Sequence, residues 1–427
     1  MTVPRLEQDI GIEVYASKSP GIGGRIRSFP EDFVVEEVLL DGSKAMIKPE
    51  GIPRVTGRGR YLVCVLVKRH WDTILATRAI ATQLRLGQDR VSFAGMKDAN
   101  ALTAQHISIS RTTPEQVASF KMKDLELHPL AYSNEKIHSK MLLGNQFHIT
   151  VREITHSLAC IEKRIRKVQD ELENAGEVPN FFGHQRFGTK RAITHLVGKH
   201  IVKGEWEKAA LTFLAKPSPF EHPQSRQVRE NLWKTQDFAE AFQSLPFKLK
   251  HERTMLSHLV KNPRDFTGAF RRLPTKLCQL FVQAYQSYLF NKFLSERIKR
   301  GIHLNEIQNG DYTTKTDDQT CLALPLIGFK QPSSLGVQGE IERRILEEEN
   351  LKPEHFRISP MPKISTPGGL RAALMSIKSF TCAEPSEDSV NPFKRQVEFS
   401  FMLGKGSYAT VVLRELMKPK NLVAAGF

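Results

Sequence analysis

The sequence lacks any long uninterrupted run of apolar residues. No stretch approaches the roughly 18 apolar residues that a membrane-spanning helix requires. Residues 1–9 also lack the apolar region of a secretory signal. We therefore expect a cytoplasmic protein that neither crosses a membrane nor enters the secretory route.

Cysteine is also scarce, and its spacing excludes the usual cysteine-based sites. No cysteine belongs to a C-x-x-C pair or lies beside a histidine-rich segment, which is typical of reduced thiols rather than disulfides or a zinc site. The five are Cys64, Cys160, Cys278, Cys321 and Cys382. His195 and His200 lie five residues apart on a predicted helix, so we expect surface histidines and no metal site.

A convincing cofactor loop is missing too. Gly21-Ile-Gly-Gly-Arg has the glycines of a dinucleotide or S-adenosylmethionine loop. No strand precedes this segment, however, and no helix plainly follows it. We therefore predict that the protein binds no such cofactor.

Negative charge is the scarcer sign. The chain has 46 Asp and Glu against 62 Lys and Arg, a net charge of +16, within an ordinary globular composition of 40% hydrophobic and 25% charged residues. Such an excess of positive charge favours a polyanionic partner, and without a membrane segment the preferred partner is nucleic acid. At 427 residues, the chain is long enough for two domains.

Strand-like and helical patterns alternate toward both ends of the chain. Runs rich in β-branched or alternating apolar residues predict strands at 33–40, 61–67, 91–94, 105–109 and 397–403. Helical spacing of apolar residues predicts helices at 158–173, 276–300 and 339–350, and a closing helix is expected to end near Leu416. Asp72 is placed to cap a further helix that carries Ile74, Leu75, Ile80 and Leu84.

The middle of the chain has a different texture. Residues 189–391 are predicted to be mostly helical, and residues 380–395, which contain prolines and polar residues, resemble a linker. We therefore predict an α/β (α+β) fold in which residues 1–188 and 392–427 form one domain. Residues 189–391 are then a domain inserted into it.

Two segments carry residues suited to chemistry. In Phe93-Ala-Gly-Met-Lys-Asp, Gly95 allows a tight turn that presents Lys97 and Asp98 at the end of a sheet. A carboxylate there can act as a nucleophile or a base, and a neighbouring cation can keep it ionised. By itself, an aspartate in a glycine-containing turn is more often structural.

The second segment is Pro179-Asn-Phe-Phe-Gly-His-Gln-Arg-Phe-Gly-Thr-Lys-Arg. Its phenylalanines offer faces on which a base can stack, and Arg186, Lys190 and Arg191 offer cations for phosphates. A core-facing aromatic turn before a helix explains the same residues equally well.

Together these segments resemble the TruD family of tRNA pseudouridine synthases. Its signatures occur in order over nearly the whole chain, and the length is similar to that of archaeal and eukaryotic members. They are Pro30-Glu-Asp-Phe-Val-Val-Glu-Glu, Phe93-Ala-Gly-Met-Lys-Asp with Thr103 and Gln105, Asn180-Phe-Phe-Gly-His-Gln-Arg-Phe-Gly, Ala284-Tyr-Gln-Ser-Tyr-Leu-Phe-Asn and Gly406-Ser-Tyr-Ala-Thr-Val-Val-Leu-Arg-Glu-Leu.

The resemblance implies a role for individual residues. Asp98 matches the family's nucleophile, and Phe33, Asn180 and Tyr408 match positions that contact the substrate uridine. Phe182 matches an aromatic ring that stacks on the target base. We add Lys97, which can hold Asp98 ionised or meet a phosphate, and Arg186 as further substrate-binding candidates.

The resemblance also implies a fold and a reaction. The fold is a pseudouridine synthase core, with a mixed sheet and a central cleft, plus an inserted TruD-specific domain. The reaction isomerises uridine to pseudouridine in tRNA, usually at uridine 13 of the D-arm, and needs neither cofactor nor metal because no atom is gained or lost. No obligate protein partner is evident, and the choice between attack at C6 and at C1′ stays open.

Two other classes of protein compete with this interpretation. A non-catalytic RNA-binding protein or RNA chaperone would use the same cleft without turnover. An RNA methyltransferase would need S-adenosylmethionine, and the missing cofactor loop disfavours it. Residues 203–275 and 310–370 match nothing assignable, so RNA contacts there stay unlocated.

Overall fold

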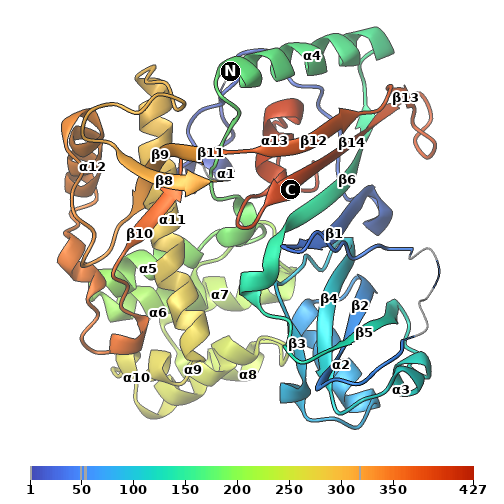
Figure 1. Cartoon of the computed structure of the whole chain (residues 1–427). Helices are drawn as coiled ribbons and strands as arrows, with labels where there is room; N and C mark the ends of the chain where they lie inside the picture. The colour runs from blue at the N-terminus through green and yellow to red at the C-terminus, as the bar shows by residue number, and fades with distance from the viewer. Residues whose placement is uncertain (1, 49–50, 52–54, 317–318) are drawn as a thin grey trace.

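The computed structural model describes residues 2–48, 51, 55–316 and 319–427 (Figure 1). Its largest feature is a nine-stranded sheet in the order β12-β14-β6-β1-β4-β2-β5, with β3 added on β4 and β13 on β14. β1 pairs with β4 in parallel and with β6 antiparallel, so the sheet is mixed, as predicted. The strands are β1 (Phe33–Leu39), β2 (Tyr61–Arg69), β3 (Val91–Phe93), β4 (Leu102–Ser110), β5 (Leu125–Ser133), β6 (Leu142–Ile154), β12 (Ile377–Cys382), β13 (Ser386–Glu387) and β14 (Arg395–Gly404).

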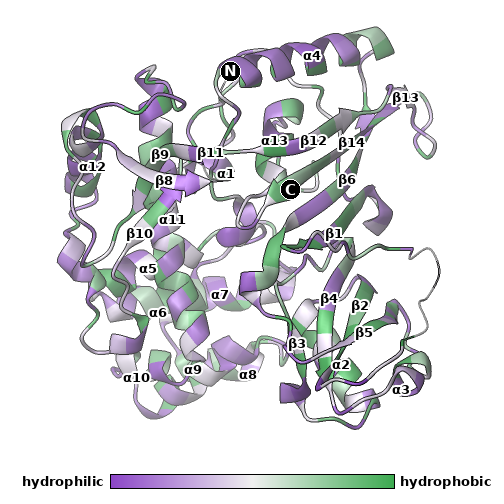
Figure 2. Ribbon diagram, viewed as in Figure 1, coloured by the Kyte–Doolittle hydropathy of each residue, from purple (hydrophilic) through white to green (hydrophobic). Residues whose placement is uncertain are grey.

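Helices α4 and α13 pack on the half of the sheet that contains β6 and β14. α4 (Leu158–Asn174) buries the apolar face that its sequence predicts, and this face joins a core with strand residues such as Val151 and Phe399. α4 is mostly hydrophilic in Figure 2, because only that one face is buried. α13 (Ala409–Met417) is buried along its whole length in the same core.

Helix α2 (Thr73–Gln83) packs on the other half of the sheet, against β2, β4 and β5. The N–H groups of Ile74 and Leu75 donate to Asp72 Oδ1 at 2.8 and 3.1 Å, which confirms the predicted N-cap. Of the apolar residues that this helix carries, Ile80 is buried together with Ala76, whereas Ile74 and Leu75 are exposed. The small alanine lets the helix lie close to the sheet, and the larger side chains beside the cap face solvent.

The middle of the chain forms a helical lobe around α11 (Thr275–Lys299). Its other helices are α5 (Thr194–Val202), α6 (Trp206–Ala215), α7 (Pro223–Thr235), α8 (Phe238–Ser244), α9 (Lys250–Lys261), α10 (Phe266–Arg271) and α12 (Gly336–Glu348). The lobe also contains a three-stranded sheet that the sequence did not predict, made of β8 (Tyr312–Thr316), β9 (Gln319–Leu326) and β10 (Gly369–Ala372). Over the described ranges, no helix is both long and apolar enough to span a bilayer.

The segment predicted to be a linker, residues 380–395, contains strand. β12 and β13 both pair with β14, so the chain re-enters the nine-stranded sheet at residue 377 rather than 392. Pro385 precedes β13 and Pro392 lies in the turn before β14, so neither proline interrupts strand pairing. The two lobes share one hydrophobic core, in which Phe399 of the sheet and Phe281 of α11 both lie.

A buried charge network ties the N-terminal segment to α13. Arg414 donates from Nε and Nη2 to the two carboxylate oxygens of Glu7, both at 2.8 Å, and from Nη1 to Glu415 at 2.5 Å. Burial raises the pKa of Glu7, but Arg414 outweighs it and lowers the pKa to about 2. Because an unpaired buried charge is costly, the network fixes α13, whose N-cap residue is Tyr408.

His195, expected at the surface, is buried instead. Its ring stacks on Tyr288 with centroids 5.3 Å apart and meets the edge of Phe187 at the same distance. The sequence showed only the i, i+5 spacing to His200, which does not reveal that α11 covers this face of α5. Burial lowers the pKa of His195 to about 3, so the folded protein keeps this ring neutral.

This burial predicts a loss of stability in acid. The unfolded chain protonates His195 near its ordinary pKa of about 6.5, whereas the folded chain does not, so unfolding takes up a proton below that pH. Between pH 6 and 4.5, protonation of His195 in the unfolded chain should lower the free energy of unfolding by roughly 2 kcal/mol. Urea unfolding of His195→Phe should show a shallower pH dependence than wild type. The same substitution at exposed His251 should not, and equal slopes for all three proteins would contradict the prediction.

Candidate active site

The turn that presents Asp98 links β3 to β4 and is held by side chains from neighbouring elements. The backbone N–H of Lys97 donates to Thr73 Oγ1 at 3.0 Å, and Gln105 Nε2 donates to the Gly95 carbonyl at 3.0 Å. The Asp98 side chain is 40% exposed. A glycine turn fixed from two sides therefore offers a carboxylate to solvent.

Lys68 of β2 holds the same turn through backbone carbonyl groups. Its ammonium donates to the carbonyls of Asp98 and Trp71 at 2.7 Å and to that of Lys97 at 3.3 Å. Burial lowers the pKa of Lys68 to about 8, although the charge of Asp98 opposes this shift. The lysine therefore fixes the backbone on which the Asp98 side chain is mounted.

Arg27 is the cation that contacts Asp98. Its Nη2 lies 2.9 Å from Asp98 Oδ2, its Nη1 donates to the Gly426 carbonyl at 3.0 Å, and its guanidinium lies 3.9 Å from the centre of the Phe33 ring. Burial lowers the pKa of Arg27, and Asp98 opposes that shift. Arg27 has φ +58°, a backbone conformation that residues other than glycine rarely adopt. The fold tolerates local strain at the residue that orients the carboxylate.

Lys97 does not have the position expected of it. Its ammonium lies 2.6 Å from Glu37 Oε2, and both side chains are buried. Burial raises the pKa of Glu37, but its bonds to His106 and the charge of Lys97 outweigh this and hold the pKa below its ordinary value. A lysine committed to this pair neither holds Asp98 ionised nor meets a phosphate. The cation that contacts the Asp98 carboxylate is Arg27 instead.

The glycines dismissed as a cofactor loop also serve this region. Gly24 has φ +86°, and a Cβ there would lie 2.7 Å from the Arg152 carbonyl. The close approach lets Arg25 form a backbone bridge with Arg152 at the edge of β6. The segment therefore positions Arg27 beside Asp98. Its glycines indicate close packing of the backbone against β6 rather than a cofactor loop.

Aromatic rings from two sequence motifs meet each other at Phe182 and Tyr408. Phe182 and Tyr408 have ring centroids 6.2 Å apart, and Phe290 of α11 meets Phe182 edge-on at 5.4 Å. Burial raises the pKa of Tyr408 and the charge of Asp98 adds to this, whereas Arg186 opposes it. Tyr408 and Asp98 therefore lie within electrostatic range of each other.

Arg371 of β10, which the sequence analysis missed, joins the aromatic rings to the remaining motif. It donates from Nε to the Asn180 carbonyl at 3.1 Å, from Nη2 to Asn180 Oδ1 at 2.5 Å, and from Nη2 to the Gly406 carbonyl at 3.0 Å. Its guanidinium lies 4.1 Å from the centre of the Phe182 ring. Burial lowers its pKa to about 10. No local pattern in the sequence distinguishes this arginine from others.

The predicted substrate-binding residues differ in how they face the site. Phe33 is only 1% exposed, and its ring packs against the Arg27 guanidinium. The ring therefore supports that arginine and is not open to a substrate. Asn180 and Phe182 are also buried, and Asn180 is bonded to Arg371 and Ala372. Arg186 lies 5.9 Å from the Phe182 ring centre and donates to side chains of α11.

A cleft of about 580 Å³ opens in front of Asp98. Arg25, Arg27, Gln185 and Lys190 are among the residues that line it, so the Asp98 turn and the 180–191 segment face one space. A partly exposed carboxylate beside cations suits nucleophilic attack on a substrate whose phosphates the cations bind. Within the described residues, no three His, Cys, Asp or Glu side chains are grouped to hold a metal ion.

Comparison with known proteins gives consistent matches along the chain. The family model described as tRNA pseudouridine synthase D (TruD) matches residues 9–322 and 316–416. A probable tRNA pseudouridine synthase D of Methanosarcina mazei is 40% identical over 99% of both chains. One from Thermococcus onnurineus is 36% identical over 95% of this chain and 97% of its own.

A solved structure is similar as well. The crystal structure of the putative tRNA pseudouridine synthase D (TruD) from Methanosarcina mazei superposes with a TM-score of 0.80. That protein is 39% identical in sequence, and the match covers 98% of this chain and 99% of the other.

Proposed function

From the premise that this chain belongs to the TruD family and is a tRNA pseudouridine synthase, we propose that Asp98 is its nucleophile and uridine 13 of the tRNA D-arm its target. One observation carries the proposal for Asp98. It is the partly exposed carboxylate that Arg27 holds at 2.9 Å in a cleft lined by further cations. The assignment of uridine 13 is supported by the family resemblance of the motifs.

The reaction needs a nucleophile and a closed space. The C1′–N1 bond breaks, the uracil turns, C5 bonds to C1′, and the proton lost from C5 balances the one gained at N1. Asp98 forms a transient covalent bond at either C6 of the uracil or C1′ of the ribose, and this bond breaks again to return the carboxylate before pseudouridine is released. Arg27 orients the carboxylate through the contact of its Nη2 with Asp98 Oδ2 at 2.9 Å.

The surrounding residues hold the uridine in place. We assign Tyr408 and Phe182 as the aromatic wall of the base pocket, with Arg371 fixing Asn180 and the Gly406 turn behind it. Phe33 contributes indirectly, because its ring supports the Arg27 guanidinium. Lys97 also contributes indirectly, because its backbone N–H helps to hold the turn that presents Asp98. Arg186 and Lys190 of the same segment suit contacts with phosphates or the base edge.

We further propose that this enzyme acts alone on tRNA in the cytoplasm. Residues 1–188, together with the strands that begin at residue 377, form the catalytic unit, and residues 189–376 form the insertion. The charge of +16 supports an RNA substrate.

The test is pseudouridine mapping on an unmodified tRNA transcript incubated with the purified protein alone. We expect one modified site, at uridine 13, and none in a matched transcript with cytidine at that position. Modification at another uridine would keep the synthase activity and reject this target. Tight binding without any pseudouridine would instead favour a non-catalytic RNA-binding protein.

A further inference from the structure

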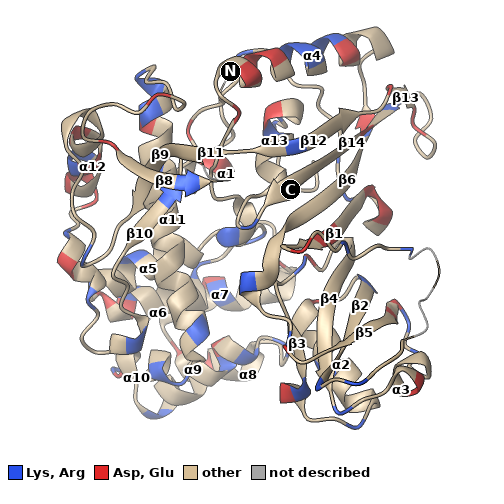
Figure 3. Cartoon of the chain, viewed as in Figure 1, with Lys and Arg blue, Asp and Glu red and all other residues tan. Residues whose placement is uncertain are grey.

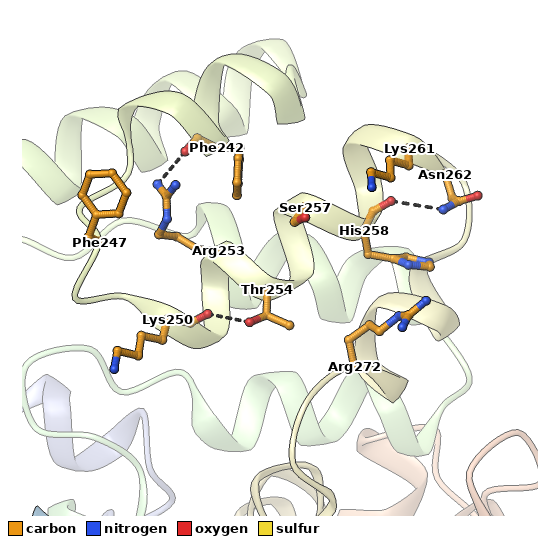
Figure 4. Close-up of a pocket in the computed structure, with 10 residues that line it drawn as sticks. All are labelled: Phe242, Phe247, Lys250, Arg253, Thr254, Ser257, His258, Lys261, Asn262 and Arg272. Atoms are coloured by element: carbon orange, nitrogen blue, oxygen red, sulfur yellow. Dashed lines mark hydrogen bonds between the residues drawn. The ribbon is translucent and has the colours of Figure 1, made fainter.

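A second hollow, of about 620 Å³, lies in the helical lobe between α8, α9 and α10 (Figure 4). Four cations line it and no carboxylate does. The cations are Lys250, Arg253, Lys261 and Arg272. Its size falls in the range of pockets that hold small ligands. This hollow belongs to a segment for which the sequence offered no functional assignment.

The chain around the hollow concentrates positive charge. Residues 246–276 contain eight Lys and Arg against two carboxylates, a net charge of +6 in 31 residues. Both carboxylates are engaged, because Glu252 pairs with Arg229 at 2.9 Å and Asp265 with His258 at 2.8 Å. Figure 3 marks Lys and Arg positions in blue along α9 and its neighbours. Among the described residues, none of the four lining cations forms a salt bridge, so the charge of the hollow is not neutralised internally.

An exposed aromatic ring stands at one end of the hollow. Phe247 is 83% exposed, which is unusual for so large an apolar side chain. The Arg253 guanidinium lies 4.4 Å from its ring centre and 4.4 Å from that of Phe242, so the arginine is held between the two rings (Figure 4). Arg253 also donates to the carbonyls of Phe242 and Leu245 at 2.6 and 2.7 Å. Phe247 is therefore mounted on a fixed support with its outer surface uncovered.

We propose that this hollow binds an unpaired nucleotide of the tRNA substrate, with Phe247 stacking on the base and Lys250, Lys261 and Arg272 contacting phosphates. Proteins that bind single-stranded RNA combine exposed aromatic rings, on which bases stack, with cations that contact the phosphates. The proposal rests on the proposed function, because it takes the RNA to be the same tRNA. It adds a second contact, in the helical lobe, to the one at Asp98.

Phe247→Ala tests the stacking. The dissociation constant of a fluorescent unmodified tRNA transcript, measured by anisotropy, should rise about fivefold or more, the change expected when one base no longer stacks. Phe247→Trp should bind like wild type. Phe393→Ala is the matched control, because Phe393 is 94% exposed and lies in the turn between β13 and β14. It should change binding by less than about twofold.

Removing charge tests the binding of phosphates. In Lys250→Gln/Lys261→Gln/Arg272→Gln, the slope of log affinity against log salt should fall by about 1 for each phosphate that the protein no longer neutralises. The control is Lys163→Gln/Arg166→Gln/Lys167→Gln, which removes three exposed cations from α4 at the opposite end of the molecule (Figure 1). It should keep the wild-type slope.

The proposal is overturned if each variant binds the transcript like its own control. A basic hollow that does not bind RNA would instead fit an acidic segment of a partner protein. Equal losses in both triple variants would also overturn it, since they would reflect overall charge rather than this hollow. The readout is binding, so a wrong target uridine or a wrong nucleophile would leave the result interpretable.

Discussion

Asp98→Asn is expected to reduce pseudouridine formation by at least about 10⁴-fold while leaving the fold and tRNA binding intact. Asparagine keeps the size of the side chain and accepts one hydrogen bond from Arg27, but it lacks the negative charge and nucleophilicity that the covalent step needs. Because the turn is held through backbone groups by Lys68 and Thr73, the substitution removes none of its supports. Pseudouridine mapping in single-turnover reactions measures the loss.

The matched control for this variant is Asp72→Asn. Asp72 caps α2 through its side chain, and asparagine is an equally good capping residue. This control should keep wild-type activity. Circular dichroism and a tRNA binding curve on both proteins separate lost chemistry from lost structure. A folded Asp98→Asn protein that binds tRNA and retains a tenth of the wild-type rate would remove Asp98 as nucleophile.

The sequence was sufficient for what depends on contiguous residues. β-branched runs predicted β1 and β2, and helical spacing predicted the buried face of α4, because burial on one face imposes the pattern directly on the chain. Asp98 was singled out for the same reason, since its turn and its motif lie in one short segment.

The sequence was insufficient where a partner comes from a distant segment. Lys97 was paired with Asp98 because the two are adjacent, yet its ammonium reaches Glu37 on β1. Arg27 and Arg371 act on residues far along the chain, and no pattern around either one reveals that interaction. Strands β8 and β13 were missed because their side chains are largely exposed and carry little apolar periodicity.

The Arg27–Asp98 pair shows how the fold holds the carboxylate of the proposed nucleophile in one orientation. Phe33 supports the guanidinium from below, and the Gly426 carbonyl accepts one of its N–H groups, so the arginine is fixed before substrate arrives. The buried Arg414 network fixes the C-terminal helix, and with it Tyr408 at its start, whose ring meets that of Phe182. Fixed charges of this kind stabilise a transition state without rearranging during the reaction.

Arg27→Met is therefore expected to lower kcat about 10²- to 10³-fold, the loss that follows removal of one preorganised polar group in other active sites. KM for tRNA should change little, because Arg27 is committed to Asp98 and is only 11% exposed. Arg27→Lys should restore part of kcat, since an ammonium can still meet the carboxylate but has no second nitrogen to reach the Gly426 carbonyl at the same time.

Arg25→Met is the matched control for Arg27→Met. Arg25 lines the same cleft and carries the same charge, but it pairs with Glu153 at 3.6 Å rather than with Asp98. Its loss should weaken tRNA binding modestly through one cation and leave kcat within about threefold of wild type. Single-turnover rates at saturating tRNA separate the two effects. If both methionine variants lost kcat equally, general cleft charge rather than the Arg27–Asp98 pair would control the chemistry.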